Sequence, residues 1–126
     1  MKNAKLGSPI PILHVRHVED ALSYYVNRLG FEVDFRYEND PQNYAGVKRD
    51  QVRLHVQRQD PGHFENGNGG HLRFRIPVDD PDLLFTEYRA MGVLEEDIQV
   101  HDTDWGTREF GFEDPDGNGL VFFTMK

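Results

Sequence analysis

The feature that most constrains the fold of this sequence is an internal repeat. Two helical patterns, residues 18–29 and 81–91, each follow an apolar strand pattern, and each ends at a glycine between apolar residues, Gly30 and Gly92. The two glycines lie about half the chain apart, which is the signature of a duplicated unit. Apolar residues within both stretches recur every three or four positions, as in a helix that packs one face on a sheet. The sequence therefore predicts one supersecondary unit used twice.

Short strand patterns separated by turn residues complete each unit. They cover residues 10–15, 31–37, 44–49 and 51–57 in the first half, and 71–76, 97–101, 107–113 and 119–125 in the second. The stretch 60–70 combines proline, asparagine and four glycines, which is typical of a linker. We predict a single α+β domain over residues 1–126, with two tandem βαβββ modules at about 8–59 and 71–126 joined by this linker.

Composition narrows the classes of function. The chain has 126 residues, 37% of them hydrophobic, without an apolar run of the roughly 20 residues that span a bilayer. It contains no cysteine and no hydrophobic segment behind its first lysines, so we expect a cytoplasmic protein without disulfides or a signal peptide. The net charge of −8 argues against nucleic-acid partners. It suits a cationic small molecule, although acidic surfaces also serve solubility alone.

Several blocks of sequence resemble one family. They are Arg28-Leu29-Gly30-Phe31, Ala45-Gly46-Val47-Lys48-Arg49-Asp50, Trp105-Gly106-Thr107-Arg108-Glu109-Phe110 and the turn Asp114-Pro115-Asp116-Gly117-Asn118. With the repeat, they resemble the vicinal oxygen chelate superfamily of glyoxalases, extradiol dioxygenases and bleomycin-resistance proteins, and within it the bleomycin-resistance proteins. The resemblance implies that each βαβββ module forms a half-barrel, that two modules form a pair, and that the chain assembles as a homodimer.

Enzymes of this superfamily hold a divalent metal with His and Glu ligands from four strands, and the resemblance allows each position to be tested. The four positions fall on Ile10, His55, His71 and Val121. Isoleucine and valine cannot coordinate, and a catalytic metal generally needs three protein ligands. His55 is read more simply as a half-buried sheet residue and His71 as an exposed strand-start residue. We therefore expect no cofactor and no catalytic residues. A divalent metal on His55 and His71 remains the alternative.

Drug-binding members of the resembled family hold a flat ligand between aromatic rings, and three rings of this chain fall on matching positions. These are Phe35, Tyr44 and Trp105. Planar rings bury much area at low entropic cost, and stacking adds about 0.5–1.5 kcal/mol per pair. Asp34, with Glu38 and Asp40, lies beside them in sequence and could attract a positive tail. Each ring also has a plainer interpretation, as sheet core for Phe35, surface for Tyr44 or barrel plug for Trp105.

These observations favour a binding protein over an enzyme. The expected ligand is a cationic, aromatic antibiotic of the bleomycin type, sequestered without a metal in clefts at a homodimer interface and conferring antibiotic resistance. One rival is a metal-dependent glyoxalase or dioxygenase that uses His55 and His71. Another is a protein whose natural ligand is an ordinary metabolite.

Overall fold

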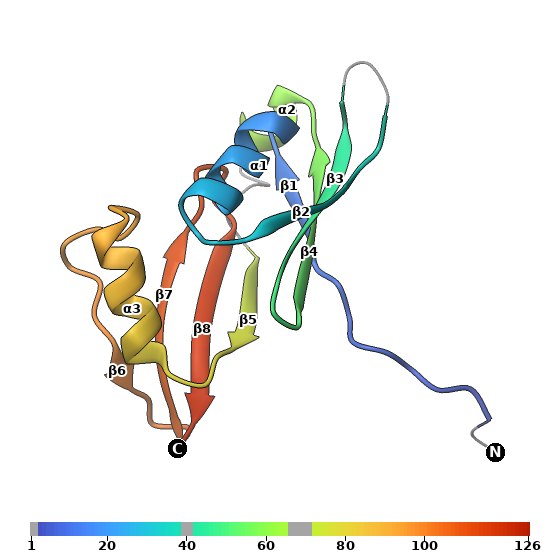
Figure 1. The fold of residues 1–126 in the computed structure, drawn as a ribbon. Helices are drawn as coiled ribbons and strands as arrows, with labels where there is room; N and C mark the ends of the chain where they lie inside the picture. The colour runs from blue at the N-terminus through green and yellow to red at the C-terminus, as the bar shows by residue number, and fades with distance from the viewer. Residues whose placement is uncertain (1–2, 39–41, 66–71) are drawn as a thin grey trace.

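The structure is a computed structural model that describes residues 3–38, 42–65 and 72–126. In each half of the chain, a strand, a long helix and three further strands follow one another as the repeat predicts (Figure 1). The elements are β1 (Ile12–Val15), α1 (Val18–Asn27), β2 (Glu32–Arg36), β3 (Tyr44–Arg49), β4 (Val52–Arg58), α2 (Pro61–Glu65), β5 (Arg73–Pro77), α3 (Pro81–Ala90), β6 (His101–Asp102), β7 (Thr107–Glu113) and β8 (Gly119–Met125).

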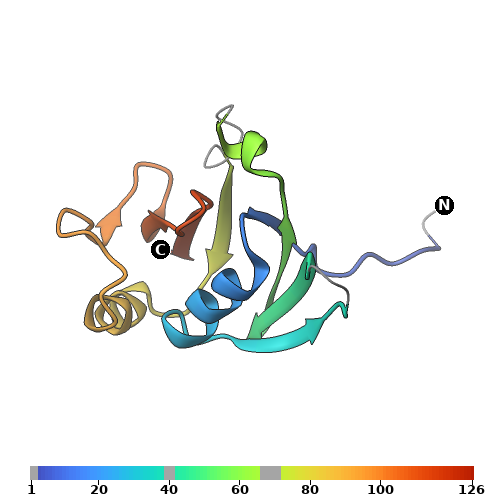
Figure 2. The ribbon, with the colours of Figure 1, turned by 90° about the horizontal axis from the view of Figure 1, so that it is seen from above.

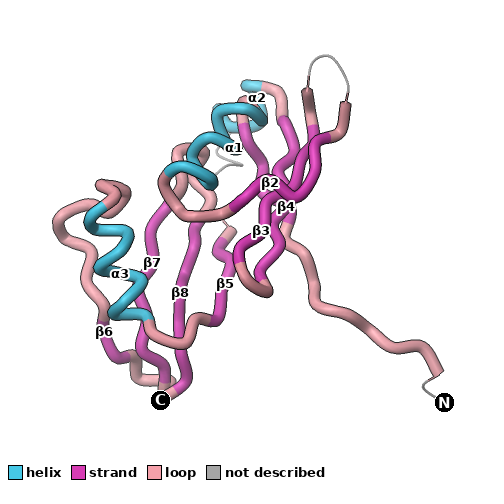
Figure 3. Tube along the Cα trace, viewed as in Figure 1, coloured by secondary structure: helices cyan, strands magenta, loops and turns pink. Residues whose placement is uncertain are grey.

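The strands form two separate sheets with the same topology. The first sheet has the order β1-β4-β3-β2 and the second the order β5-β8-β7-β6. In each sheet the first strand pairs in parallel with the last, and the other pairs are antiparallel. We call β1 to β4 with α1 module one, and β5 to β8 with α3 module two. The predicted α+β fold of two βαβββ modules is confirmed, and Figure 3 shows the two groups of strands with their helices.

Each long helix covers its own sheet, and both helices lie toward the same side of the molecule (Figure 2). Asp80 begins α3 by accepting a hydrogen bond from the Leu83 amide at 3.1 Å, and Pro81 occupies the first turn, where no amide donor is required. The buried residues of α1 are Val18, Ala21, Leu22 and Tyr25, and those of α3 are Pro81, Leu84 and Tyr88. In the part of the chain that the structure describes, no helix is long and apolar enough to cross a membrane.

The two modules are joined at the turn between β7 and β8, in which Asp114 and Asn118 are buried. The Tyr25 hydroxyl on α1 donates to Oδ2 of Asp114 at 2.7 Å, and the other carboxylate oxygen accepts from the amides of Asp116 and Asn118. Burial raises the pKa of Asp114, outweighing these hydrogen bonds. Burial, and then the charge of Asp114, raises the pKa of Tyr25 well above its ordinary value. The predicted Asp-Pro-Asp-Gly-Asn turn therefore fastens module two to the helix of module one.

Two segments differ from their predictions. Residues 97–101 were expected to form a strand, but β6 has only two residues, and Ile98 instead packs against the core while its carbonyl accepts from Arg89 at 2.8 Å. The predicted linker contains a short helix, α2, which begins at Pro61. A proline needs no amide partner at a helix start, and the Asp60 carbonyl accepts from the His63 amide at 2.9 Å.

Candidate functional site

The face of the first sheet opposite α1 carries a cluster of three rings. Strand register places Phe35 on β2 beside Gly46 on β3, and Gly46 beside His55 on β4. Tyr44 follows on the same face, because side chains two residues apart share a side of the sheet. The ring centroids of Phe35 and His55 are 5.0 Å apart, those of Tyr44 and His55 5.4 Å, and those of Phe35 and Tyr44 6.1 Å. We call Phe35, Tyr44 and His55 the ring cluster.

Two backbone features allow this cluster to form. The pairing of β2 with β3 shifts between Val33 and Phe35, which leaves Asp34 as the extra residue of a β-bulge and aims the Phe35 ring away from the core. A Cβ atom on Gly46 would lie 2.4 Å from the Phe35 ring and 3.2 Å from the His55 ring. Glycine at position 46 therefore makes room for both rings.

The cluster combines stacking area with one polar contact. The Tyr44 hydroxyl and Nδ1 of His55 are 2.8 Å apart, and the tautomer of the imidazole decides which of the two donates. The contact fixes both rings at the sheet surface. Phe35 remains 36% exposed, so part of its ring is free to contact a ligand. The arrangement can stack a flat molecule on aromatic edges and faces without moving the backbone.

Asp34 lies beside the cluster with its carboxylate already paired. Nη1 of Arg53 lies 2.6 Å from one oxygen, and Nζ of Lys48 lies 3.9 Å from the other. Its side chain is 19% exposed. A ligand cation at this position would have to compete with both basic side chains. Glu38 is exposed, and Asp40 lies outside the described residues.

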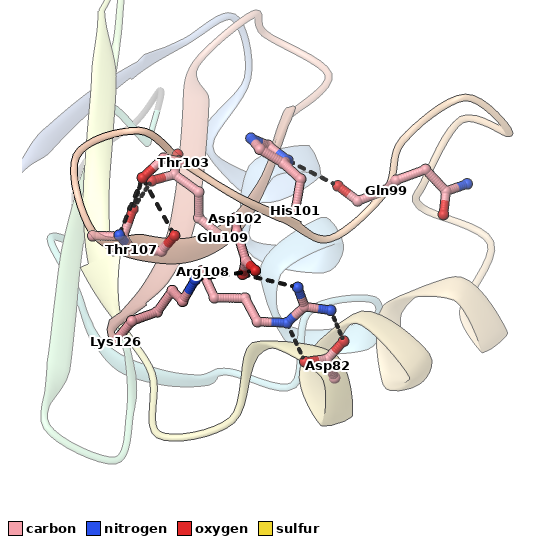
Figure 4. Close-up of polar contacts among 9 residues, drawn as sticks. All are labelled: Asp82, Gln99, His101, Asp102, Thr103, Thr107, Arg108, Glu109 and Lys126. Carbon is pink, nitrogen blue, oxygen red and sulfur yellow. Dashed lines mark hydrogen bonds and ion pairs between the residues drawn. The ribbon is translucent and has the colours of Figure 1, made fainter.

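Trp105 lies in the connection between β6 and β7. Hydrogen bonds between Thr103 and Thr107 close this connection on either side of it (Figure 4). The Thr103 amide donates to the Thr107 carbonyl at 2.8 Å, and the Thr107 amide donates to the Thr103 hydroxyl at 3.1 Å. Gly106 adopts a φ of 90°, and its carbonyl accepts from the Lys126 amide at 2.9 Å. The Trp105 side chain is nevertheless 66% exposed. The hydrogen-bonded loop thus holds the indole ring of Trp105 in an exposed position.

An ion-pair network fixes the base of this loop. Arg108 on β7 contacts Asp82 on α3 at 2.7 Å and Asp102 on β6 at 3.0 Å, and Lys126 also contacts Asp102 at 3.1 Å (Figure 4). The hydrogen bonds from Arg108 hold the pKa of both carboxyl groups below the ordinary value. Because the anchors lie on α3, β6 and the C-terminal end of β8, the loop belongs firmly to module two.

A single chain does not bring Trp105 to the ring cluster. The β6–β7 connection and the β2–β3 hairpin lie on opposite sides of the molecule in both Figure 1 and Figure 2. The structure therefore unites two of the three predicted rings, Phe35 with Tyr44. It adds His55, which the sequence analysis interpreted as a half-buried sheet residue, or alternatively a metal ligand, and not as part of a ligand site.

The corresponding face of the second sheet carries a polar network with a single ring, Phe123, instead of a ring cluster. Oε1 of Glu109 on β7 accepts from Arg75 at 3.0 Å and from the Thr107 hydroxyl at 2.7 Å, and the Arg75 guanidinium lies 4.4 Å from the centre of the Phe123 ring. Burial acts to raise the pKa of Glu109, but the hydrogen bonds from Arg75 and Thr107 prevail and lower it. Glu109 was part of a recognised motif, yet the sequence did not indicate this role.

The superfamily metal positions that the structure describes do not gather ligands. Ile10 is exposed, Val121 is buried on β8, and His55 is bonded to Tyr44. His71 lies outside the described residues. Within residues 3–38, 42–65 and 72–126, no three His, Cys, Asp or Glu side chains lie close enough together to hold a metal ion. The positions that the structure describes do not fit a catalytic metal, because two of them, Ile10 and Val121, carry aliphatic side chains.

Comparison with known proteins agrees with this architecture. The model of the Glyoxalase/Bleomycin resistance protein/Dioxygenase superfamily matches residues 10–122, so the chain belongs to this superfamily. Bleomycin resistance proteins of Geobacillus stearothermophilus and Staphylococcus aureus are each 26% identical to it over 90% of this chain and 93% of theirs.

Solved structures give the same result. The bleomycin-binding protein of bleomycin-producing Streptomyces verticillus, complexed with copper(II)-bleomycin, is 29% identical, with a TM-score of 0.75 over 94% of this chain and 96% of that one. A bleomycin-binding protein complexed with bleomycin has a TM-score of 0.80 over 96% of this chain and all of that chain, at 20% identity. The second likeness shows the fold alone.

Proposed function

We propose that the protein binds and sequesters a flat, cationic, aromatic antibiotic of the bleomycin type, without a metal and without breaking bonds in it. The observation that carries the proposal is the ring cluster, held open on a sheet face by Gly46 and the β-bulge. Relatives named bleomycin resistance proteins and a 29% identical protein solved with copper(II)-bleomycin support the class of ligand.

The proposed site is shared between two copies of the chain. Phe35 and Tyr44 of one copy face Trp105 of the other, and a two-fold axis makes two such clefts per dimer. The separation of Trp105 from the ring cluster within one chain supports this arrangement. An exposed indole on a hydrogen-bonded loop can stack on a ligand at low entropic cost, because the loop loses little conformational freedom when a ligand covers the ring. The net charge of −8 attracts a cation.

Titration with bleomycin tests the ligand. Trp105 is the only tryptophan, so its emission reports the cleft directly. We expect a saturable change in emission and a matching heat in calorimetry. The variant Phe35→Ala should lose at least tenfold in affinity, or about 1.4 kcal/mol. Leu83→Ala, an exposed apolar residue on α3, is the matched control and should bind like wild type. Unchanged emission with no heat at saturating drug would overturn the proposal.

Mixing two defective variants tests the shared cleft. At a drug concentration that just saturates wild type, Phe35→Ala and Trp105→Ala should each bind little drug alone. If they are unfolded together and refolded, half of the dimers become mixed, and each mixed dimer has one intact cleft. Drug binding should return to about a quarter of the wild-type capacity. A site built within one chain would show no such recovery, and a monomer in light scattering would exclude a shared cleft.

A further inference from the structure

Two histidines outside the ring cluster lie in direct contact. Nδ1 of His14 on β1 and Nε2 of His63 on α2 are 3.0 Å apart, and the two rings meet edge to face with centroids 4.8 Å apart. The residues are distant in sequence and come together because α2 folds back over β1. Beside them the Arg16 guanidinium lies 4.1 Å from the centre of the Phe64 ring, which also holds α2 against the strand.

The histidine pair lies on the same sheet face as the ring cluster. Leu13 and Val15 are fully buried on the core side of β1, so His14 between them points to the opposite face. Register then places His14 beside Gln57 on β4, and Gln57 beside Tyr44 on β3.

The separation of the two nitrogens fits a shared metal ion. Imidazole nitrogens bind Zn²⁺ and similar ions at about 2.0–2.1 Å. Two such nitrogens on one ion are therefore about 2.9 Å apart at a right angle and about 3.3 Å apart at a tetrahedral angle. The 3.0 Å observed lies within this range. A simple hydrogen bond between the imidazoles has a similar length, so an experiment must separate the two.

We propose that His14 and His63 together bind one divalent transition-metal ion, with Nδ1 of His14 and Nε2 of His63 as ligands and water in the remaining positions. Each neutral imidazole then carries its proton on the other ring nitrogen, and no net proton release is required. Imidazole pairs favour Cu²⁺ over Ni²⁺ and Zn²⁺. The site is distinct from the four superfamily metal positions, and it does not depend on the proposed drug binding. A bound ion would fasten α2 to β1.

Copper titration of the untagged protein tests the site. At neutral pH we expect one saturable Cu²⁺ per chain in calorimetry, and an electron paramagnetic resonance spectrum split by two imidazole nitrogens. His14→Gln and His63→Gln should each weaken Cu²⁺ binding at least tenfold and remove the two-nitrogen pattern. The matched control is His17→Gln, because His17 is exposed and its side chain makes no capping hydrogen bond. It should bind like wild type.

A second readout concerns α2 itself. Saturating Ni²⁺ should raise the melting temperature of wild type and slow hydrogen exchange in α2, since an ion bound only by the folded state stabilises that state. Neither effect should occur in His63→Gln. The proposal fails if wild type shows no saturable binding, if either glutamine variant binds as tightly as wild type, or if His17→Gln loses as much affinity as they do. The pair would then be a hydrogen bond only.

Discussion

Module one packs aliphatic side chains under its sheet, whereas module two packs aromatic rings in the equivalent place. The fully buried strand residues of module one are Leu13, Val15, Ala45, Val47, Leu54 and Val56. In module two, Phe110, Phe112 and Phe122 stack with centroids 5.6–6.2 Å apart, and Tyr88 meets all three edge to face. The outer faces differ in the opposite sense, because module one carries the three rings of the ring cluster and module two an Arg75–Glu109 pair with the single ring of Phe123. One topology thus uses aromatic area for stability in one copy and exposes it in the other.

The largest expected effect is on the aromatic core. Phe110→Ala should lower the free energy of unfolding by about 4 kcal/mol, because it removes a fully buried ring from the stack and leaves a cavity. Leu54→Ala, at a fully buried site of module one, should lower it by about 3 kcal/mol. Urea unfolding of both variants provides the measurement. A larger loss for Leu54→Ala would break the comparison between the two cores.

The second largest effect on the free energy of unfolding is expected at the buried tyrosines of the two helices. Tyr25→Phe removes a hydrogen bond to the Asp114 carboxyl group, and should lower the free energy of unfolding by about 2 kcal/mol. Tyr88→Phe removes a bond of 2.8 Å to the Leu29 carbonyl, and about 1 kcal/mol is expected. Both variants keep the ring, so urea unfolding isolates the hydroxyl. Equal losses of unfolding free energy would mean that the hydrogen bond to Asp114 stabilises the protein no more than the hydrogen bond to the Leu29 carbonyl does.

Substitution of one glycine in each sheet compares the roles of the two outer faces in drug binding. Gly46→Ala would drive a methyl group into the Phe35 ring, so we expect about tenfold weaker bleomycin binding. Gly111 is its counterpart on β7, where a Cβ atom would meet the Leu120 carbonyl at 3.1 Å. Gly111→Ala should lower stability while affinity changes by less than about twofold. Calorimetric titration compares the two. If Gly46→Ala binds like wild type, the ring cluster does not contact the drug.

Glu109 should give module two an acid-sensitive contribution. Its pKa is lowered in the folded state, so its stabilisation is present above the unfolded value of 4.5 and is lost as pH falls through the folded value. Glu109→Gln should therefore lower the free energy of unfolding by about 1 kcal/mol at neutral pH, and the difference should shrink as the pH falls below 4.5. Asp114 acts with the opposite sign, because its raised pKa removes stability as pH rises. A constant difference between wild type and Glu109→Gln at every pH would contradict this assignment.

The smallest effect concerns Asp34. Its charge is already paired with Arg53 and Lys48, so Asp34→Asn should weaken binding of a cationic drug by less than about threefold. That loss should disappear in high salt, because screening weakens exposed charge interactions. Glu38→Gln, at an exposed position of module one, is the control for charge alone. A tenfold loss that persists in salt would show that the drug displaces the basic partners and contacts Asp34 directly.

The sequence was sufficient for most of the fold because hydrophobic periodicity and turn chemistry are local signals. The strands at 44–49, 107–113 and 119–125 were predicted with their observed bounds. Helix α2 was missed because its five residues lie within glycine- and asparagine-rich sequence, and tertiary contacts of Phe64 and His63 hold it.

The candidate site was harder to predict from the sequence than the fold was. Phe35 and Tyr44 were predicted through family resemblance, and the structure brings them together. The place of His55 in the cluster depends on the register of β3 with β4 and on the β-bulge at Asp34, and neither has a local signature. Residue identity alone could not distinguish a metal ligand from a hydrogen-bonded ring.

The parallel pairing of first and last strands has a consequence for folding during synthesis. Strand β1 can pair only after β4 has been synthesised, and β5 only after β8 has been synthesised. Local hairpins such as β3–β4 form early, whereas these distant pairings close late because more chain must be ordered first. Module one can therefore complete its sheet while the ribosome is still making module two. Module two keeps its aromatic core exposed until β8 has been synthesised, and in this period chaperones and aggregation compete for the chain.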